Sequence, residues 1–201
     1  MNIAKKNFRG ETVLLSADID LQSQNWTPVG QTGATQFLGT FDGQGKTIKN
    51  LTVETVDTGE NYSSGLFGWL NSATVKNLKI TGATITGHHN IGTIAGYLET
   101  SGCTIENCHV SNATISCTNA NKDANGDKCG GIVGQAGNAG VLVKDCTVTN
   151  SSISAGRDAG QVAGAAQEAN VVNCSASEVT VTANGTSTGA NIRNEVIGRV
   201  L

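Results

Sequence analysis

Proline, aromatic residues and charge are all scarce in this 201-residue sequence. It contains one Pro, 4% aromatic residues and 14% charged residues, with a net charge of −3 at pH 7. So few aromatic side chains favour a narrow core of stacked aliphatic residues over one wide globular core. The small net charge and the lack of a basic run argue against nucleic acid and anionic membrane surfaces as partners.

Long apolar runs are missing too. No stretch approaches the roughly 18 apolar residues that a membrane-spanning helix needs, so we expect no membrane insertion. The first residues, Met1–Lys6, are basic, but the apolar segment of a signal peptide does not follow them. We interpret the chain as part of a longer repeat protein whose targeting signal lies elsewhere.

The sequence does contain a repeat of about 30 residues. Each copy starts at an Asn or Asp anchor and has small or apolar residues one and three positions later, and the last four copies have them six and eight positions later as well. The anchors are Asn50, Asn77, Asn107, Asp145 and Asn173. A tetrapeptide that ends in Gly also recurs, at residues 65–68, 93–96, 131–134, 161–164 and 195–198. A repeat of this length predicts stacked supersecondary units rather than one globular core.

Within each copy the apolar residues recur with a period of two, which is typical of strands and not of helices. We predict about three short strands per copy, with successive rungs about 4.8 Å apart. The fold class is therefore all-β, a parallel β-helix of about five rungs. Parallel crossovers favour a right-handed coil. We assign residues 1–37 to an N-terminal cap with larger side chains and a first incomplete coil, and residues 38–201 to the repeats, as one continuous domain.

The five anchors are expected to form a structural ladder. Side-chain amides stacked at an inward corner can hydrogen-bond from rung to rung, as Asn ladders do in stacked sheets. The residue after each anchor would then belong to one inward column, which contains Leu51, Leu78, Cys108, Cys146 and Cys174.

The six cysteines divide into two groups. Cys108, Cys146 and Cys174 are interpreted as small hydrophobic core residues, because an in-line column does not give the converging geometry of a metal site. Cys103, Cys117 and Cys129 lie outside that column. Since Cys117 and Cys129 bracket an insertion at residues 118–128, they either close it with a disulfide or remain thiols.

The insertion resembles the start of a calcium-binding loop only in part. Its Asp123, Asn125 and Asp127 alternate as calcium ligands do, but Lys128 and Gly134 stand where such a loop has Gly and Glu. We therefore expect a solvated, protruding loop that holds no metal.

Several segments together resemble the GLUG-repeat family of bacterial cell-surface proteins. They are Ala17–Leu21, Trp26–Gly30, Gly39–Ile48, Gly65–Gly68 and Val75–Leu78, followed by the later Gly-ended tetrapeptides. The resemblance covers nearly the whole chain and implies a β-helical, non-catalytic stretch of a large secreted or surface-anchored protein, such as an adhesin or the stalk of an immunoglobulin-cleaving peptidase. It implies no catalytic residues. The cysteines and the insertion depart from the family pattern.

No catalytic arrangement is visible in the sequence. Polysaccharide-cleaving β-helices need clustered carboxylates, and no outward column has acidic residues on successive rungs. His88, His89 and His109 have no evident nucleophile or orienting partner. We therefore predict that the protein is not an enzyme and binds no cofactor.

One outward array is regular enough to be a candidate ligand-binding site. Hydroxyl residues stand at i and i+2 on the third strand of four copies: Thr84, Thr86, Thr114, Ser116, Ser152, Ser154, Thr180 and Thr182. Thr and Ser are also ordinary solvent-facing residues of strands, so a purely structural role remains an alternative.

The function expected from these observations is a non-catalytic adhesion or spacer module, extracellular or at the cell surface. Glycans or host surface proteins are its candidate partners. Two alternatives remain open: an ice-binding β-helix that uses the hydroxyl array, and a carbohydrate-active β-helix enzyme.

Overall fold

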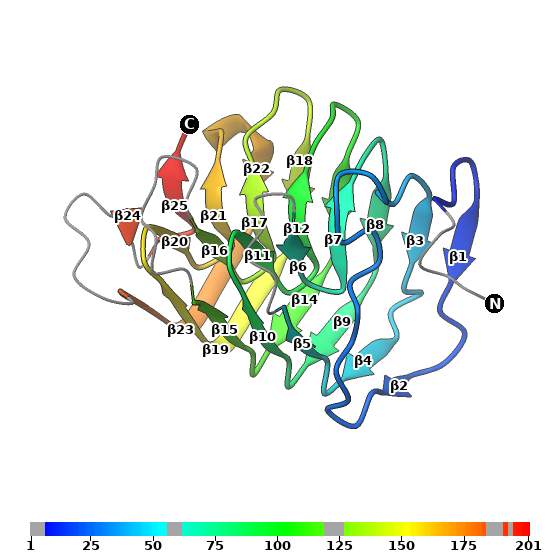
Figure 1. The fold of residues 1–201 in the computed structure, drawn as a ribbon, viewed down its shortest axis with the longest axis horizontal. Coiled ribbons are helices and arrows are strands. Elements are labelled where there is room, and N and C mark those ends of the chain that lie inside the picture. Colours follow the sequence, from blue (N-terminus) through cyan, green and yellow to red (C-terminus); the bar gives the residue numbers. More distant parts are fainter. Residues whose placement is uncertain (1–6, 56–61, 119–126, 184–190, 193–194) are drawn as a thin grey trace.

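Parallel strands stacked coil upon coil form the fold. The computed structural model describes residues 7–55, 62–118, 127–183, 191–192 and 195–201. Within these residues the elements are 25 strands and one short 3₁₀ turn, Glu168–Asn170, and no helix is long or apolar enough to cross a membrane. Successive coils lie side by side between the two termini (Figure 1). The predicted all-β parallel β-helix is confirmed, and its right-handed winding stays a prediction.

The strands belong to four sheets, and hydrogen-bonded strands are neighbours in the order of each sheet. Sheet I contains β1 (Thr12–Leu14), β3 (Thr40–Asp42), β8 (Thr74–Lys76), β13 (Thr104–Glu106), β18 (Leu142–Lys144) and β22 (Val171–Val172). Sheet II contains β2 (Ile19–Asp20), β4 (Thr47–Lys49), β9 (Lys79–Thr81), β14 (His109–Ser111), β19 (Thr147–Ala155), β15 (Thr114–Cys117), β10 (Thr84–Gly87) and β5 (Thr52–Glu54), with β23 (Ser175–Ala183) beside β19.

The other two sheets are smaller. Sheet III contains β24 (Asn191–Ile192), β20 (Asp158–Gly160), β16 (Lys128–Gly130), β11 (Asn90–Gly92) and β6 (Ser63–Ser64). Sheet IV contains β25 (Ile197–Val200), β21 (Ala163–Ala166), β17 (Val133–Ala136), β12 (Ala95–Leu98) and β7 (Phe67–Leu70). These five-strand stacks agree with the prediction of about five rungs.

One turn of the coil visits all four sheets. The chain runs through β8 in sheet I, β9 and β10 in sheet II, β11 in sheet III and β12 in sheet IV, and then β13 pairs with β8 in parallel. A full turn therefore has five short strands, and the prediction of about three was wrong. The difference arises because bends at two corners of each coil, and a tight step between sheets III and IV, divide the copy into shorter pieces.

The N-terminal segment follows the same path. β1 pairs with β3 and β2 pairs with β4 in parallel. Further on, isolated parallel bridges join Asn25 to Thr52, Val29 to Phe67 and Phe37 to Leu70. Large side chains close this end of the core, since the ring centroids of Phe37 and Phe67 are 4.9 Å apart. Segments on both sides of residue 37 pair with later coils in the same parallel way. The boundary between cap and repeats at residue 37 therefore stays a prediction.

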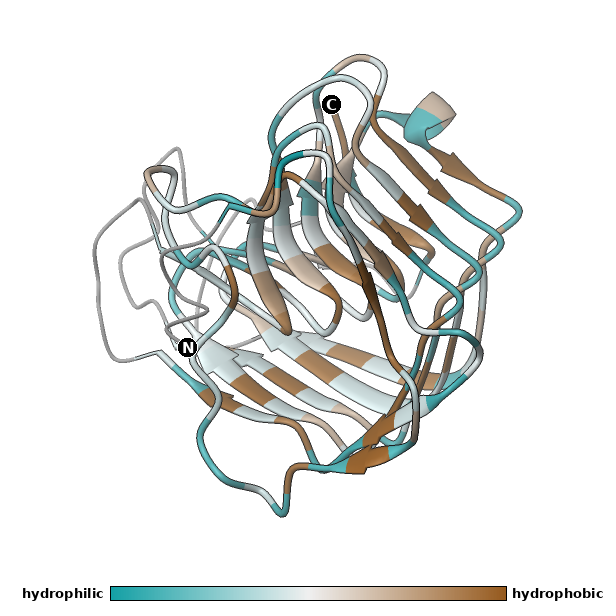
Figure 2. Ribbon diagram, turned by 90° about the vertical axis from the view of Figure 1, so that its right-hand side faces the viewer, coloured by the Kyte–Doolittle hydropathy of each residue, from teal (hydrophilic) through white to brown (hydrophobic). Residues whose placement is uncertain are grey.

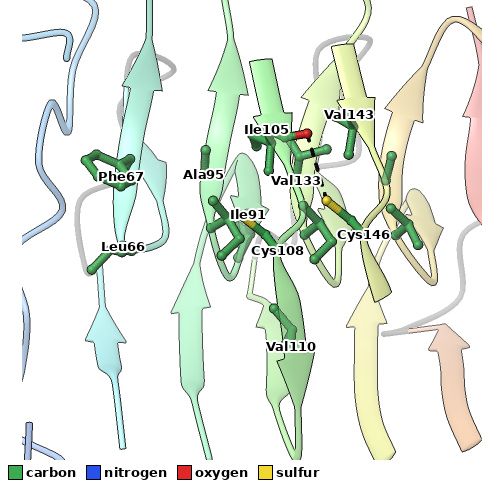
Figure 3. Close-up of a cluster of buried hydrophobic side chains, with 14 of the residues drawn as sticks. Leu66, Phe67, Ile91, Ala95, Ile105, Cys108, Val110, Val133, Val143 and Cys146 are labelled. Carbon is green, nitrogen blue, oxygen red and sulfur yellow. Dashed lines mark hydrogen bonds between the residues drawn. The ribbon is translucent and has the colours of Figure 1, made fainter. Parts of the chain in front are cut away.

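Inward side chains of successive coils stack into apolar columns. Val75, Ile105 and Val143 pair in register on sheet I, and none of them is exposed to solvent. Figure 2 shows the resulting apolar bands, which cross neighbouring strands, and Figure 3 shows several of these side chains gathered between the sheets. Each buried methylene group contributes about 0.8 kcal/mol, so the columns supply the main apolar stabilisation of each turn.

The final glycine of each recurring tetrapeptide lies where sheet IV meets the backbone of sheet III. A Cβ added at Gly134 would lie 2.4 Å from the backbone nitrogen of Ile91, on the preceding coil. The same substitution at Gly164 would place a Cβ 2.5 Å from the nitrogen of Cys129. No side chain fits between two backbones at this distance, which explains why glycine recurs at this position.

Replacing Gly134 with Ala should therefore destabilise the protein by about 2–3 kcal/mol, since the backbones of two coils would have to separate. Gly33→Ala is the matched control, because its added Cβ would lie no closer than 3.8 Å to the Trp69 ring. Chemical denaturation of both variants measures the difference. Equal free energies of unfolding for the two variants would contradict the close backbone contact.

Candidate functional site

The predicted hydroxyl array lies on the outer face of sheet II, on β10, β15, β19 and β23. Backbone pairing places one column in register along Thr84, Thr114, Ser152 and Thr180, and a second along Thr86, Ser116, Ser154 and Thr182. The first column is exposed, and the second is half-buried except at its end. We call these eight residues the hydroxyl face. Their predicted stacking is confirmed, and their role in ligand binding stays a prediction.

A groove that the sequence analysis did not identify runs beside the hydroxyl face. It has a volume of about 380 Å³ and crosses β4, β9, β14 and β19. Eight outward side chains line it, in two columns: Thr47, Lys79, His109 and Thr147, and then Lys49, Thr81, Ser111 and Thr149. The groove and the hydroxyl face meet along β19, which contributes Thr147 and Thr149 to one and Ser152 and Ser154 to the other. The signal that could have revealed it is the alternation of polar and apolar residues along the second strand of each copy, as in Lys79, Ile80 and Thr81.

His109 is held across the groove by its two ring nitrogens. Nε2 lies 3.1 Å from Asn107 Oδ1, and Nδ1 lies 2.9 Å from Thr147 Oγ1. The amide of Asn107 is itself oriented, because its Nδ2 donates to Asn77 Oδ1 at 2.9 Å. With Oδ1 of Asn107 facing the ring, Nε2 carries a proton and donates to it. The imidazole is therefore fixed before any ligand arrives.

The lysines of the groove differ from those on the neighbouring sheet in their ion pairing. On sheet I, Lys144 pairs with Glu106 at 3.1 Å and Lys76 with Asp42 at 3.8 Å. Lys49 and Lys79 are exposed, and none of the described carboxylates lies within ion-pair distance of either. The end of the groove on β4 and β9 therefore carries two exposed lysines that form no ion pair with a described carboxylate.

The Asn ladder forms at an outer corner, so its predicted inward position was wrong. Asn107, Asp145 and Asn173 are exposed and Asn77 is half-buried. Each has a left-handed backbone, with φ between 50° and 55°. Asn and Asp are among the few residues with a side chain that tolerate this conformation, which bends the chain between sheets I and II. These four residues stack on one another as predicted.

Asn50 does not belong to this column, although the sequence analysis placed it there. Lys49 pairs with Thr81, so Asn50 follows β4 and stacks over Gly82, at the second corner. Both residues have positive φ, 56° and 69°. Asn50 still bonds to the coil before it, because its Nδ2 lies 2.8 Å from Asp20 Oδ1. Leu51 accordingly stacks with Ala83, not with Leu78.

Hydrogen bonds along the ladder run from each coil to the preceding one. Asn77 donates to Asp42, Asn107 to Asn77, and Asn173 to Asp145. The side chain of Asp145 is a carboxylate and has no N–H group to donate, so the described side-chain contacts of the ladder divide there into two parts. The bonds from Asn77 and from the backbone of Gln44 lower the pKa of Asp42. Its contribution to stability is therefore present above the ordinary carboxyl pKa and is lost as the pH falls through the folded-state value.

Replacing Asn107 with Leu should destabilise the protein by about 1–2 kcal/mol, because Leu fits poorly at positive φ and cannot make the bonds to Asn77 and His109. Asn107→Gly, which keeps the backbone conformation and loses only the side-chain bonds, should cost less. The melting temperatures of the two variants test this order. A Leu variant as stable as the wild type would contradict a stabilising role for the ladder.

The six cysteines all lie in the described residues, and none of them forms a disulfide. The disulfide considered between Cys117 and Cys129 is not formed: both are buried thiols, and Cys117 donates to the carbonyl of His88 at 3.1 Å. Cys108 and Cys146 are buried, and Cys174 is half-buried, as core residues. The neighbouring Cys108 thiol, together with burial, raises the pKa of Cys146 to about 12.

The insertion is only partly described, since residues 119–126 lie outside the described part of the chain. Its last two residues are buried rather than solvated, contrary to the prediction. Asp127 accepts a hydrogen bond from the backbone of Gly156, and Lys128 stacks beside Asp158 at the start of β16. Burial lowers the pKa of Lys128, because desolvation disfavours its charged form.

Among the described residues, the side chains that commonly bind metals do not form a site. No three of their His, Cys, Asp or Glu side chains are placed to hold a metal ion. The lining of the groove contains hydroxyls, two ammonium groups and one imidazole but no carboxylate. Its chemistry is therefore that of binding through hydrogen bonds and positive charge.

Comparisons with known proteins give one relative and one related structure. An alignment 136 residues long, which covers 63% of the chain, shows 35% identity to halomucin from Haloquadratum walsbyi (strain DSM 16790 / HBSQ001). The match spans 1% of halomucin's length. No family model matches the chain, so the GLUG resemblance stays a prediction.

The related structure is the crystal structure of a putative immunoglobulin A1 protease from Bacteroides ovatus. It superposes with a TM-score of 0.53 at 17% identity, covering 93% of this chain and 77% of the other. At this identity the likeness shows the fold alone. The comparisons therefore place the chain among β-helix proteins without fixing its ligand.

Proposed function

We propose that this chain is a non-catalytic binding segment of a secreted or cell-surface protein, and that the outer face of sheet II binds glycans. One observation carries the proposal. Two neighbouring strands of each coil direct hydrogen-bonding side chains outward, in register over four coils, and these side chains form the groove and the hydroxyl face.

Glycans suit this surface because hydroxyl groups both donate and accept hydrogen bonds, as sugar hydroxyls do. The side chains sit on strands of a stacked scaffold, and several are already tied to one another, as Ser111 is to Thr81 at 3.0 Å. A preorganised surface loses less entropy on binding than a flexible one. The extended face of a solenoid also suits a ligand longer than one sugar.

The match to halomucin supports the idea of a segment within a longer chain. Because the aligned stretch is 1% of that protein, related sequence occurs there as a small part of a very large molecule. The proposed surface or secreted location and the proposed absence of catalysis also follow the GLUG resemblance.

The ice-binding alternative depends on the same register. A regular array of hydroxyl and methyl groups would need Thr throughout, but Ser116, Ser152 and Ser154 lack the methyl group. Ser154 also donates to Ser116 at 3.2 Å, which uses one hydroxyl within the face. Sugar binding through individual hydroxyls is less sensitive to these gaps, so we favour it.

A glycan array, extended with mucin and matrix proteins, tests the proposal on the intact chain. We expect reproducible glycan binding that weakens when Thr84→Val and Thr114→Val remove two hydroxyls from the hydroxyl face, or when Thr147→Val removes one from the groove. Thr104→Val on sheet I is the matched control and should bind normally. A blank array, or thermal hysteresis without glycan binding, would contradict the proposal.

A further inference from the structure

The groove contains a compact cluster of hydrogen-bond donors at its N-terminal end. Lys49 and Thr81 are direct neighbours across β4 and β9, and Lys79 lies two residues before Thr81 on the same face of β9. All three line the groove. Two lysine side chains and one hydroxyl are therefore neighbours on the same end of the groove.

The Thr81 hydroxyl is committed as an acceptor. Its Oγ1 receives a hydrogen bond from Ser111 Oγ at 3.0 Å and another from Asn112 Nδ2 at 3.3 Å. With both lone pairs occupied, the Thr81 proton remains to be donated to a ligand. The orientation of this donor does not depend on the ligand, since β14 and the corner after it set it.

The two lysines repel each other when nothing lies between them. Their neighbours on sheet I show the usual solution, an ion pair within the protein, as between Lys144 and Glu106. Asp20 lies opposite Lys49 across β2 and β4 and keeps its negative charge, but it forms no ion pair with Lys49, and its carboxylate accepts from Asn50 and from the backbone of Gln22. Lys79 has Thr47 and His109 as its direct neighbours in its column and therefore no acidic neighbour there. An anion placed between Lys49 and Lys79 would remove the repulsion and accept from Thr81.

From this geometry we infer that the groove selects anionic glycans, with the carboxylate or sulfate group held by Lys49, Lys79 and Thr81. The inference rests on the proposed function and names its ligand class. A free anion would use only this end of the groove. The remainder crosses β14 and β19, where the fixed ring of His109 and the hydroxyls of Thr147 and Thr149 offer neutral contacts to the uncharged part of a sugar chain.

The test measures the affinity of the intact chain for an oligogalacturonate, for dextran sulfate, for uncharged dextran and for inorganic sulfate. We expect both polyanions to bind more tightly than dextran. Lys49→Gln with Lys79→Gln should weaken polyanion binding about tenfold, as should a rise in salt from about 50 mM to about 500 mM, because exposed ion pairs are screened. Lys144→Gln is the matched control and should change affinity by less than about twofold.

The outcomes separate this inference from the proposed function. Dextran binding as tight as polyanion binding, or polyanion binding unaffected by the Lys49 and Lys79 substitutions, would overturn the anionic selectivity and leave the glycan surface standing. Inorganic sulfate bound as tightly as the polyanions would overturn the assignment to a glycan. If no saccharide binds, both proposals fail. Matching melting temperatures of the variants exclude unfolding as the cause.

Discussion

Backbone hydrogen bonds between successive coils, kept in one register, are the interaction on which the rest of this structure depends. Parallel pairing fixes each residue over its counterpart on the next coil, and a slip of one residue would turn every inward side chain toward solvent. Because the register holds along sheet II, Ile80, Val110 and Val148 stack inside while Thr81, Ser111 and Thr149 stack outside. The same pairing thus generates both the core and the proposed binding surface.

Two local conditions let each coil close in that register. Left-handed residues bend the chain at the corner between sheets I and II and again within sheet II, and glycines such as Gly134 let sheet IV approach the backbone of sheet III. One of these corner residues also contacts the groove. Asn107, held at its corner by Asn77, accepts a hydrogen bond from His109 and so fixes a ring that lines the groove. Structural and binding residues are therefore linked through one side chain.

Much of this arrangement could be predicted from the sequence, because a period of two and a repeat of about 30 residues constrain a solenoid strongly. These two periods alone predicted that Thr84 and Thr114 stack in one column. The error at Asn50 has a physical origin: both corners need positive φ, both accept Asn followed by an apolar residue, and the sequence alone does not separate them. The groove was missed because Lys79 and His109 stand in one of its two columns, so the column does not read as a series of hydroxyl residues. Its volume also depends on how the side chains of four coils converge, which the sequence does not show.

The register itself can be measured by cross-linking outward positions on sheet II. Neighbouring parallel strands are about 4.8 Å apart, within the reach of a disulfide, whereas positions two coils apart are not. The combination Thr84→Cys with Thr114→Cys should therefore lose two titratable thiols on mild oxidation, and Thr84→Cys with Ser152→Cys should lose none. Failure of the first combination to cross-link, or equal cross-linking of both, would contradict the coil register from which the core, the ladder and the groove all follow.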